Sequence, residues 1–391
     1  MPMASIRTIE QVAVIGGGVA GSAAALALAR LGVRVTVHEA RPDPAGVVGS
    51  FVSLAANGLR CLDALGGDLA QAVTRAGFDV PEQRMWSARG KCLGQVARNR
   101  RATDPRPSVT LRRADLVSAL RAAADSAGAQ ITVGRRVSGA EDLRELTQCA
   151  DLVIGADGLW SVVRTVLNPG AAAPRYAGVY SVSGTAPAPA HGVDTTPGVF
   201  NMVFSRGGAF VHLTAPDGTV WWNAQVSERA EPDPARLART GPAELAAIFR
   251  DSRHAAAVLE HARVDTRTLT HVLPATPCRH DGERTVLIGD AVHPVGAGQG
   301  ASMALEDAVV LARHLRGAPT LAAALTAFDQ ARQQRLRKMA AAARRNRDAK
   351  TMGPIQARVR DVIMPVVFPR AYPAATNWLY DFDPEARPAG S

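Results

Sequence analysis

The feature that most restricts the fold of this chain lies near its N-terminus, where two β-branched runs flank a glycine turn and an alanine-rich segment. The first run, residues 12–15, leads into GGGVAG, and the second, residues 33–38, ends at Glu39. The turn carries the pattern G-x-G-x-x-G at Gly16, Gly18 and Gly21. A strand, a glycine turn, a helix and a second strand that ends in an acid are typical of a βαβ unit that binds a dinucleotide.

Each glycine of this turn has a separate physical task. Gly16 permits the tight turn, Gly18 lets a pyrophosphate approach the amides at the helix start, and Gly21 allows close packing of helix on strand. We expect Val19 and Ala20, at the start of the helix, to contact the same ligand. Glycines alone would also suit an ordinary loop, so this prediction depends on the complete βαβ context.

The residues at the end of the second strand are expected to bind the ribose of the ligand. Glu39 stands 18 residues after Gly21, at a spacing where an acidic side chain accepts hydrogen bonds from ribose hydroxyls. Ala40 and Arg41 follow directly and are expected to contact the cofactor as well. This pattern does not distinguish NAD from FAD, so later segments must decide.

Two later segments repeat the combination of a buried strand, glycines and a carboxylate. In ADLVIGADGLWSVVRTVL, an apolar strand over 152–154 precedes Asp157 and Gly158, with Arg164 on a short helix beyond. In TVLIGDAVHPVGAGQGAS, a strand ends at Asp290, and a second glycine group opens a helix. Apolar residues three and four positions apart predict that this helix faces the core.

With GGGVAG, GADGLWSVVR and GDAVHPVGAGQGAS in this order, the chain resembles the group A flavoprotein monooxygenases, the single-component aromatic hydroxylases of the p-hydroxybenzoate hydroxylase fold. The resemblance extends over essentially the whole chain. It implies an α/β fold with an FAD-binding Rossmann-like domain, an interleaved antiparallel β-sheet substrate domain and C-terminal helices. The dinucleotide would then be FAD, with NADPH or NADH as a transient co-substrate.

The resemblance also implies roles for residues of the later motifs. Asp290 would accept hydrogen bonds from the ribityl hydroxyls of FAD. Arg113 would contact the flavin from the start of a helix, with a solvated helix-start arginine as the alternative. Asp157, Gly158 and Arg164 would lie near the FAD pyrophosphate and the NAD(P)H path, and Arg164 could instead be a plain surface residue.

The loop and helix after Asp290 are expected to lie against the flavin ring. The helix N-terminus would point at N1 and the C2 carbonyl, where reduced flavin is negative, because unpaired amides and the helix dipole favour an anion. His293 is expected to be a hydrogen-bonded loop residue rather than a metal ligand or an acid-base group. The loop is shorter than in the resembled family, which leaves the oxygen pocket undefined. The cofactor contacts expected here are Pro294, Gly298, Gln299, Gly300 and Ala301.

Segments of alternating polarity predict the substrate sheet. Residues 82–98 indicate two short strands around Arg89-Gly90, and residues 207–228 indicate a hairpin around Pro216-Asp217-Gly218. Alternation places Phe210, His212 and Thr214 together on the first strand, and on the second it separates Trp222, Ala224 and Val226 from Trp221, Asn223 and Gln225. Periodicity does not say which set lines the pocket.

Our substrate-contact candidates are Phe210, His212 and Trp222, together with Pro294 of the later loop. His212 is also the candidate catalytic residue, because a positioned base could deprotonate a phenol and make it a better nucleophile. A lone histidine on a strand is more often structural, and aromatic residues more often belong to the core. Both alternatives stay open.

These patterns divide the chain into interleaved segments. The FAD-binding parts are residues 1–75, 109–172 and 276–350, the substrate parts are 76–108 and 173–275, and a C-terminal helical segment covers 351–391. Residues 139–150 show helical spacing where the resembled family usually carries a longer β-meander, so we expect a trimmed flavin domain. The basic segment to about Lys350 is expected to form one or two helices, and VRDVIMPVVFP a packed C-terminal helix rather than a membrane contact.

The formal charge of +10 raises the question of nucleic-acid binding. The 45 Lys and Arg residues are spread along the chain with one local concentration, so we expect only a modest attraction for anionic ligands. The four cysteines form no CxxC pair, so neither a disulfide framework nor a metal site is expected. No apolar run approaches the ~20 residues of a membrane helix, and the chain start lacks a signal-peptide core, so we expect a cytoplasmic protein.

The resemblance implies an NAD(P)H-dependent FAD monooxygenase. NAD(P)H would reduce the flavin, molecular oxygen would form a flavin C4a-hydroperoxide, and this species would hydroxylate an aromatic or electron-rich small molecule. One alternative is a halogenase or reductase on the same scaffold, although the halogenase signature W-x-W-x-I-P is not found. Another is a non-catalytic flavoprotein that binds a biosynthetic intermediate. The substrate, the choice between NADH and NADPH, and a monomeric or homodimeric state stay open.

Overall fold

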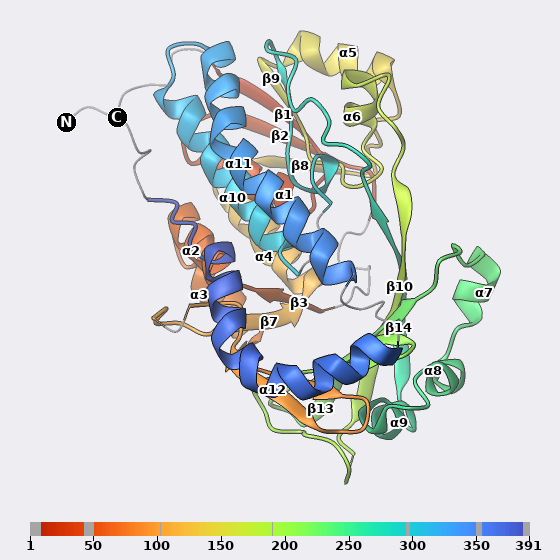
Figure 1. The fold of residues 1–391 in the computed structure, drawn as a ribbon. Helices are drawn as coiled ribbons and strands as arrows, with labels where there is room; N and C mark the ends of the chain where they lie inside the picture. Colours follow the sequence, from red (N-terminus) through yellow and green to blue (C-terminus); the bar gives the residue numbers. More distant parts are fainter. Residues whose placement is uncertain are drawn as a thin grey trace.

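The computed structural model describes residues 9–42, 51–101, 103–189, 191–294, 298–348 and 354–385. Figure 1 shows a parallel sheet with its helices at one end of the molecule and a second large sheet at the other. Two long strands, β10 (Arg175–Pro187) and β14 (Arg263–Val272), run along one side between the two ends. The expected α/β class, with a Rossmann-like parallel sheet, a separate second sheet and C-terminal helices, is confirmed.

Five parallel strands form the first sheet, in the order β15-β9-β1-β2-β8. Their bounds are β1 (Gln11–Ile15), β2 (Arg34–Glu39), β8 (Gln130–Val133), β9 (Leu152–Gly155) and β15 (Thr285–Leu287). One face packs on α1 (Val19–Ala29), α4 (Arg113–Ser126) and α10 (Gly300–Gly317), and the other packs on α5 (Ala140–Cys149) and α6 (Val162–Leu167). Because β1 is buried on both faces, it consists of one continuous apolar run. The helix expected over residues 139–150 is confirmed as α5.

A small antiparallel sheet, in the order β3-β7-β4, lies between the two large sheets (Figure 1). It contains β3 (Phe51–Leu54), β4 (Phe78–Val80) and β7 (Ser108–Arg112). Two helices, α2 (Ala56–Leu65) and α3 (Leu69–Arg75), join β3 to β4 and belong to the same core as α1 and α10. This sheet therefore connects the core around the parallel sheet to the second large sheet.

The second large sheet has the order β14-β10-β13-β12-β11-β5-β6. Its remaining strands are β5 (Glu82–Ser87), β6 (Cys92–Ala97), β11 (Val199–Ser205), β12 (Gly208–Thr214) and β13 (Thr219–Ser227). The expected strands over 82–98 and the expected hairpin are confirmed. The sheet is mixed rather than purely antiparallel, because β11 and β5 come from distant parts of the chain and pair in parallel.

Three short helices cover one face of this mixed sheet: α7 (Pro234–Arg239), α8 (Pro242–Ile248) and α9 (Arg253–Leu259). Phe210 and Trp222 are fully buried beneath them, with ring centroids 6.1 Å apart. Phe249, at the end of α8, completes the cluster with its ring 5.8 Å from that of Phe210. This face is therefore a hydrophobic core.

The C-terminal helices pack on both ends of the molecule. The basic segment forms α11 (Leu321–Asp348), as expected, and α12 (Pro354–Thr376) crosses β6 (Figure 1). Phe368 of α12 fits over Gly94, where a Cβ would lie 2.6 Å from its ring. In this segment Phe368 is packed as expected, whereas Ile363 and Val367 are exposed. Among the described residues no helix has the length and apolar character needed to cross a membrane.

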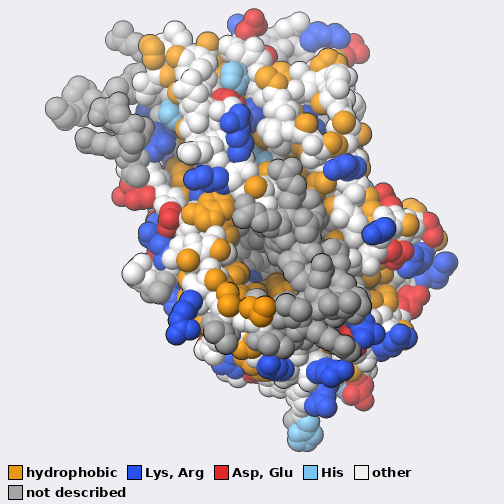
Figure 2. Space-filling view, in the orientation of Figure 1, with side chains coloured by type: hydrophobic (Ala, Val, Ile, Leu, Met, Phe, Trp, Pro, Cys, Tyr) orange, Lys and Arg blue, Asp and Glu red, His pale blue; other side chains and the backbone are white. Residues whose placement is uncertain are grey.

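Charged side chains are intermingled on the face shown in Figure 2. Basic side chains are scattered there with acidic ones among them, rather than gathered into one patch. On this face the net charge of +10 does not produce the continuous basic surface that nucleic-acid binding uses.

His212 lies in the core on the helix-covered face. Its Nε2 is 2.8 Å from Nδ1 of His254 on α9, and both side chains are buried. Burial lowers the pKa of His212 to about 3, helped by the neighbouring His254, and burial lowers the pKa of His254 to about 4, against the opposing charge of Asp194. Trp86 of β5 packs its ring 4.9 Å from that of His254. The pair is therefore neutral near pH 7.

We expect this pair to make the protein sensitive to acid. An unfolded histidine titrates near pH 6.5, so below that pH the unfolded chain binds more protons than the folded one. The folded state keeps its full stability above about pH 6.5, where both histidines are neutral in either state. Its free energy of unfolding then decreases as the pH falls toward 4. Melting temperatures from pH 7.5 to 4.5 measure this loss, and replacing both His212 and His254 with Gln reduces the slope. Replacing the exposed His191 with Asn is the control, and an unchanged slope in the double variant contradicts the prediction.

Candidate active site

The three glycine-and-carboxylate turns meet because they follow three neighbouring strands. The strands β15, β9 and β1 are adjacent and parallel, so their carboxyl ends lie at the same edge of the sheet. Backbone hydrogen bonds continue past the strand ends, from Ala156 N to Ile15 O at 2.8 Å and from Ile288 N to Gly155 O at 3.0 Å. This edge is where ligands bind in open α/β sheets.

The first turn shows the geometry that its glycines predict. Gly16 has φ of +98°, and a Cβ there would lie 2.5 Å from the carbonyl oxygen of Ala156. A Cβ on Gly21 would lie 1.9 Å from the carbonyl oxygen of Gly16, so the start of α1 packs directly on the turn. A Cβ on Gly18 would have no described heavy atom within 4 Å, since Gly18 faces a cavity.

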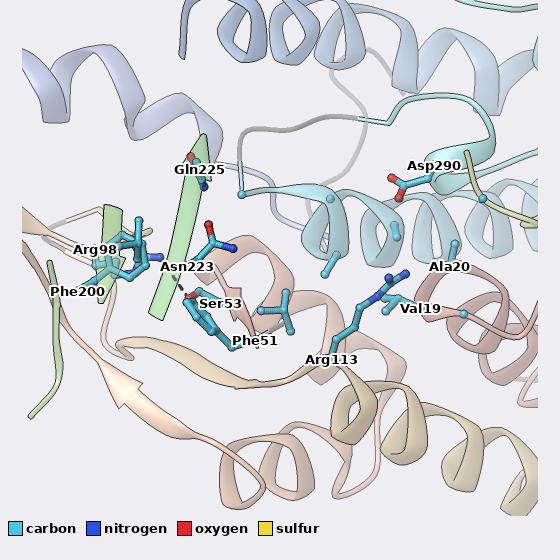
Figure 3. Close-up of a pocket in the computed structure, with 18 of the residues that line it drawn as sticks. Val19, Ala20, Phe51, Ser53, Arg98, Arg113, Phe200, Asn223, Gln225 and Asp290 are labelled. Carbon is cyan, nitrogen blue, oxygen red and sulfur yellow. Dashed lines mark hydrogen bonds between the residues drawn. The ribbon is translucent and has the colours of Figure 1, made fainter. Parts of the chain in front are cut away.

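The cavity has a volume of about 400 Å³, within the range of small-molecule sites. Its cofactor side is lined by Gly18, Val19, Ala20, Arg113, Ala156, Gly158, Asp290, Gly298, Gly300, Ala301 and Ala304. Its substrate side is lined by Phe51, Val52, Ser53, Arg98, Phe200, Val211, Asn223 and Gln225. Figure 3 shows the labelled members of both groups around this space.

Two helix N-termini open onto the cofactor side. Helices α1 and α10 begin there, and neither has a side chain that caps its first turn. The first N–H groups of a helix have no partner within the helix, and the helix dipole places positive potential at this end. Both ends are therefore suited to bind negatively charged groups.

Asp290 and Arg113 approach the cofactor side from different elements (Figure 3). Asp290 lies in the short 3₁₀ helix η1 (Gly289–Ala291), and Arg113 begins α4. The Asp290 carboxylate is exposed to the cavity. The protein around it keeps it away from bulk water, and this desolvation raises its pKa. No hydrogen bond from a described protein group reaches it, which leaves its oxygens available to ligand hydroxyls.

Glu39 lies beside the glycine turn, with part of its hydrogen-bonding capacity already used. Its Oε2 accepts from Gly17 N at 3.0 Å and from Arg121 Nη2 at 2.8 Å, and its Oε1 accepts from Arg41 N at 2.9 Å. Arg121 also donates to the Gly17 carbonyl. Arg121 was not among the residues expected at the site, although it lies in α4, the helix that begins with Arg113.

The second turn is held by its own side chains. Asp157 accepts from Ser161 Oγ at 2.5 Å and from Val162 N at 2.7 Å, which caps α6, and burial raises its pKa. Arg164 is buried and donates to the carbonyl oxygens of Leu159 and Ala291. Arg164 is thus neither a surface residue nor part of the cavity wall, and it ties the second turn to the third. Gly158 does line the cavity.

The third turn is fixed by Asp307 of α10. Its Oδ2 accepts from Gly289 N at 2.8 Å and bonds His293 Nε2, and its Oδ1 accepts from Arg332 Nε at 2.7 Å. Burial alone would raise the pKa of Asp307, but the charges of His293 and Arg332 lower it well below its usual range. His293 is therefore a hydrogen-bonded loop residue, and the described part of the chain holds no cluster of three or more residues suited to a metal ion.

The loop after His293 is only partly described. Pro294 is half-buried, residues 295–297 lie outside the described ranges, and Gly298 and Gly300 line the cavity. Gln299 is buried beneath them, and its Oε1 accepts from Asn57 Nδ2 at 3.4 Å. Of the expected contacts in this loop, the structure brings the glycines and Ala301 to the cavity surface.

The structure does not bring Phe210, His212 and Trp222 to the cavity. They face the opposite side of the mixed sheet, where α8 and α9 bury them. The alternate residues Val211, Asn223 and Gln225 face the cavity instead, with Phe200 of β11 beside them. Because the helices cover one face, only the other face can meet a ligand, and the buried His212 is replaced as a site residue by these neighbours.

The cofactor side of the cavity fits FAD. The open space at Gly18 and the N-terminus of α1 suit a pyrophosphate, the cavity-facing carboxylate of Asp290 suits polyol hydroxyls, and the N-terminus of α10 suits an electron-accepting ring. An uncharged ligand would make no use of the helix ends.

Comparison with known proteins gives the same cofactor. The family model described as FAD binding domain matches residues 10–346. Kynurenine 3-monooxygenase of Salinispora arenicola is 30% identical, covering 84% of this chain and 77% of the relative. The 3-hydroxybenzoate 6-hydroxylase 1 of Aquipseudomonas alcaligenes is 28% identical, covering 95% and 97%. A solved salicylate hydroxylase substrate complex shares the fold with a TM-score of 0.77 at 21% identity, covering 98% and 100%.

Gly18→Val tests the first turn. We expect FAD affinity to fall by at least about tenfold, since the added side chain would fill the space that a pyrophosphate needs. The measurement is FAD retained after gel filtration and the Kd for readdition to apoprotein. Gly170→Val is the control, because Gly170 is exposed and also has open space around it. Wild-type affinity in Gly18→Val would contradict the assignment.

Asp290→Ala tests the third turn. Loss of a charged hydrogen-bond acceptor costs about 1.5–3 kcal/mol, so we expect weaker FAD binding with an unchanged fold. Spectroscopic titration of the apoprotein with FAD measures the change, with circular dichroism as the check on folding. The control is Asp63→Asn, a surface carboxylate paired with Arg106. A fully loaded, tightly binding Asp290→Ala protein argues against this role.

Proposed function

This chain belongs to the FAD binding domain family, and from that premise we propose that it is an FAD-dependent monooxygenase that hydroxylates an aromatic or similarly electron-rich small molecule. The co-substrates are NADPH or NADH and molecular oxygen. The observation that carries the proposal is a single cavity with an FAD-compatible wall on one side and a substrate sheet on the other. Any substrate in this space lies directly beside the cofactor.

The named relatives support a hydroxylase. Their names describe the oxygenation of kynurenine, 3-hydroxybenzoate and salicylate, which are all aromatic compounds. These relatives are monooxygenases and hydroxylases, so a halogenase is not favoured.

When bound, FAD would accept hydride from NAD(P)H and, once reduced, react with oxygen to supply the oxidising group. The protein's role is to bind FAD, to orient the substrate beside it and to exclude water. Asp290 would hold ribityl hydroxyls, and the N-terminus of α10 would stabilise negative charge on the ring. Phe51, Phe200 and Val211 give the substrate side an apolar wall that displaces water.

Polar side chains on the same wall would orient the substrate. Ser53 and Asn223 bring a hydroxyl and a carboxamide to the cavity, where they can bond substituents of a ring. His212 takes no part in proton transfer, because it is buried on the other side of the sheet. The reaction would proceed in the cytosol by a monomer or homodimer.

We expect FAD-loaded protein to oxidise NADPH or NADH faster when an aromatic hydroxy or amino compound is added. Isotopically labelled O₂ should place one labelled oxygen atom in the product, because a monooxygenase transfers one atom and reduces the other to water. Absorbance of the reduced nicotinamide and mass spectrometry of the product give the two readouts. The Asp290→Ala protein without added FAD is the control. If no compound in a broad aromatic panel stimulates oxidation, the hydroxylase proposal fails.

A further inference from the structure

Arg98 occupies the substrate side of the cavity, away from the cofactor turns (Figure 3). It follows β6 directly and is only 7% exposed, yet it belongs to the cavity wall. A guanidinium in such a position is a charge removed from bulk water, and burying a charge is costly unless it is paired. Its surroundings therefore show what it is built to bind.

Neutral groups surround the Arg98 guanidinium. Its Nη1 donates to Gln83 Oε1 at 2.8 Å and its Nη2 donates to Ser53 Oγ at 3.2 Å, while its Nε is buried without a partner. The Phe200 ring lies beneath the guanidinium, 3.2 Å from Cζ to the ring centroid. A guanidinium has five N–H donors, so these two hydrogen bonds leave donors unused.

No carboxylate of the described residues forms an ion pair with Arg98. Three other buried arginines have such partners: Arg121 pairs with Glu39, Arg279 with Asp329, and Arg332 with Glu306 and Asp307. Buried Arg164 instead donates to two backbone carbonyls, and unlike Arg98 it does not line the cavity. Burial lowers the pKa of Arg98 to about 10, so the group is still positively charged near pH 7. The cavity thus contains a buried positive charge that the described chain leaves uncompensated.

Building on the proposed function, we propose that Arg98 is a specificity-determining residue that binds a carboxylate of the aromatic substrate. A planar carboxylate matches the fork of a guanidinium and would supply the missing negative charge. Stacking on Phe200 and the hydrogen bonds from Arg98 to Gln83 and Ser53 hold the guanidinium in place. The carboxylate would lie at this end of the cavity, so the rest of the ring would extend toward the cofactor side.

Asn223 supplies a second polar position on the same side. Its carboxamide donates to Ser183 Oγ at 2.5 Å, and its Oδ1 is buried without a hydrogen-bond partner. Asn223 and Arg98 both line the cavity. A ring that carries a carboxylate and a hydroxyl or amino group could therefore use both.

Binding of matched ligand pairs to FAD-loaded protein tests the proposal. The pairs are salicylate with salicylamide, 3-hydroxybenzoate with 3-hydroxybenzamide, and 4-hydroxybenzoate with 4-hydroxybenzamide. Kd values come from the change in the flavin absorbance spectrum at pH 7.5, which requires no turnover. We expect at least one carboxylate to bind about tenfold or more tightly than its amide. A panel in which no carboxylate is preferred overturns the proposal, whatever the oxidation assay shows.

Variants of Arg98 test whether this residue causes the preference for a carboxylate over its amide. Arg98→Gln should weaken carboxylate binding by about 10- to 100-fold, the range for a lost charged hydrogen bond, and leave amide binding nearly unchanged. Arg98→Lys should keep part of the preference, because it keeps the charge, and it serves as the test if the Gln variant folds poorly. Arg106→Gln, at an exposed pair with Asp63, is the control. Wild-type preference in a folded Arg98→Gln protein would falsify the assignment.

Discussion

The cavity of this protein depends on one buried carboxylate, that of Asp307 in α10. It binds the backbone of Gly289, the imidazole of His293 and the guanidinium of Arg332 at once, so that the third turn, the following loop and α11 share one anchor. The neighbouring Glu306 extends the anchor to Arg335, which donates to the carbonyl oxygens at 378 and 379 in the C-terminal segment. Removing one partner of such a buried network costs about 3–5 kcal/mol, whereas a surface pair costs little. The position of Asp290 is therefore set by charges that never touch a ligand.

Much of the cofactor half could be predicted from the sequence, because its signals are local. Gly16 has positive φ, and Gly21 of α1 packs directly on the turn. Both positions require glycine, so the sequence shows them as glycines at a fixed spacing. The acids after β9 and β15 follow short apolar runs that are typical of buried strands. The strand order β15-β9-β1 is not a local property, however, and the sequence patterns did not predict it. That order is what makes three separate turns into one site.

The substrate half was harder to predict because its deciding interactions are long-range. Alternation in the hairpin defines two faces, but polarity does not choose between them, because apolar Val211 of the first strand shares a face with polar Asn223 and Gln225 of the second. The choice is made by α8 and α9, which bury Phe210 and Trp222 and leave Asn223 on the cavity side. His212 was a candidate base because the sequence does not show that it pairs with His254, which lies 42 residues further along the chain. The parallel pairing of β11 with β5 escaped prediction for the same reason.

Arginine content carries little information about this protein, whereas the pairing of each buried arginine carries a good deal. Basic side chains on the face in Figure 2 are dispersed among acidic ones, and most of the buried guanidinium groups described above serve the fold through a carboxylate or backbone carbonyls. Arg332 and Arg98 are both buried, yet Arg332 meets two carboxylates and Arg98 meets none among the described residues. Because an uncompensated buried charge is costly, a ligand carboxylate would stabilise the Arg98 guanidinium where the described fold supplies none. The cavity wall is where such a partner can enter, and this links the unpaired charge to the ligand rather than to stability.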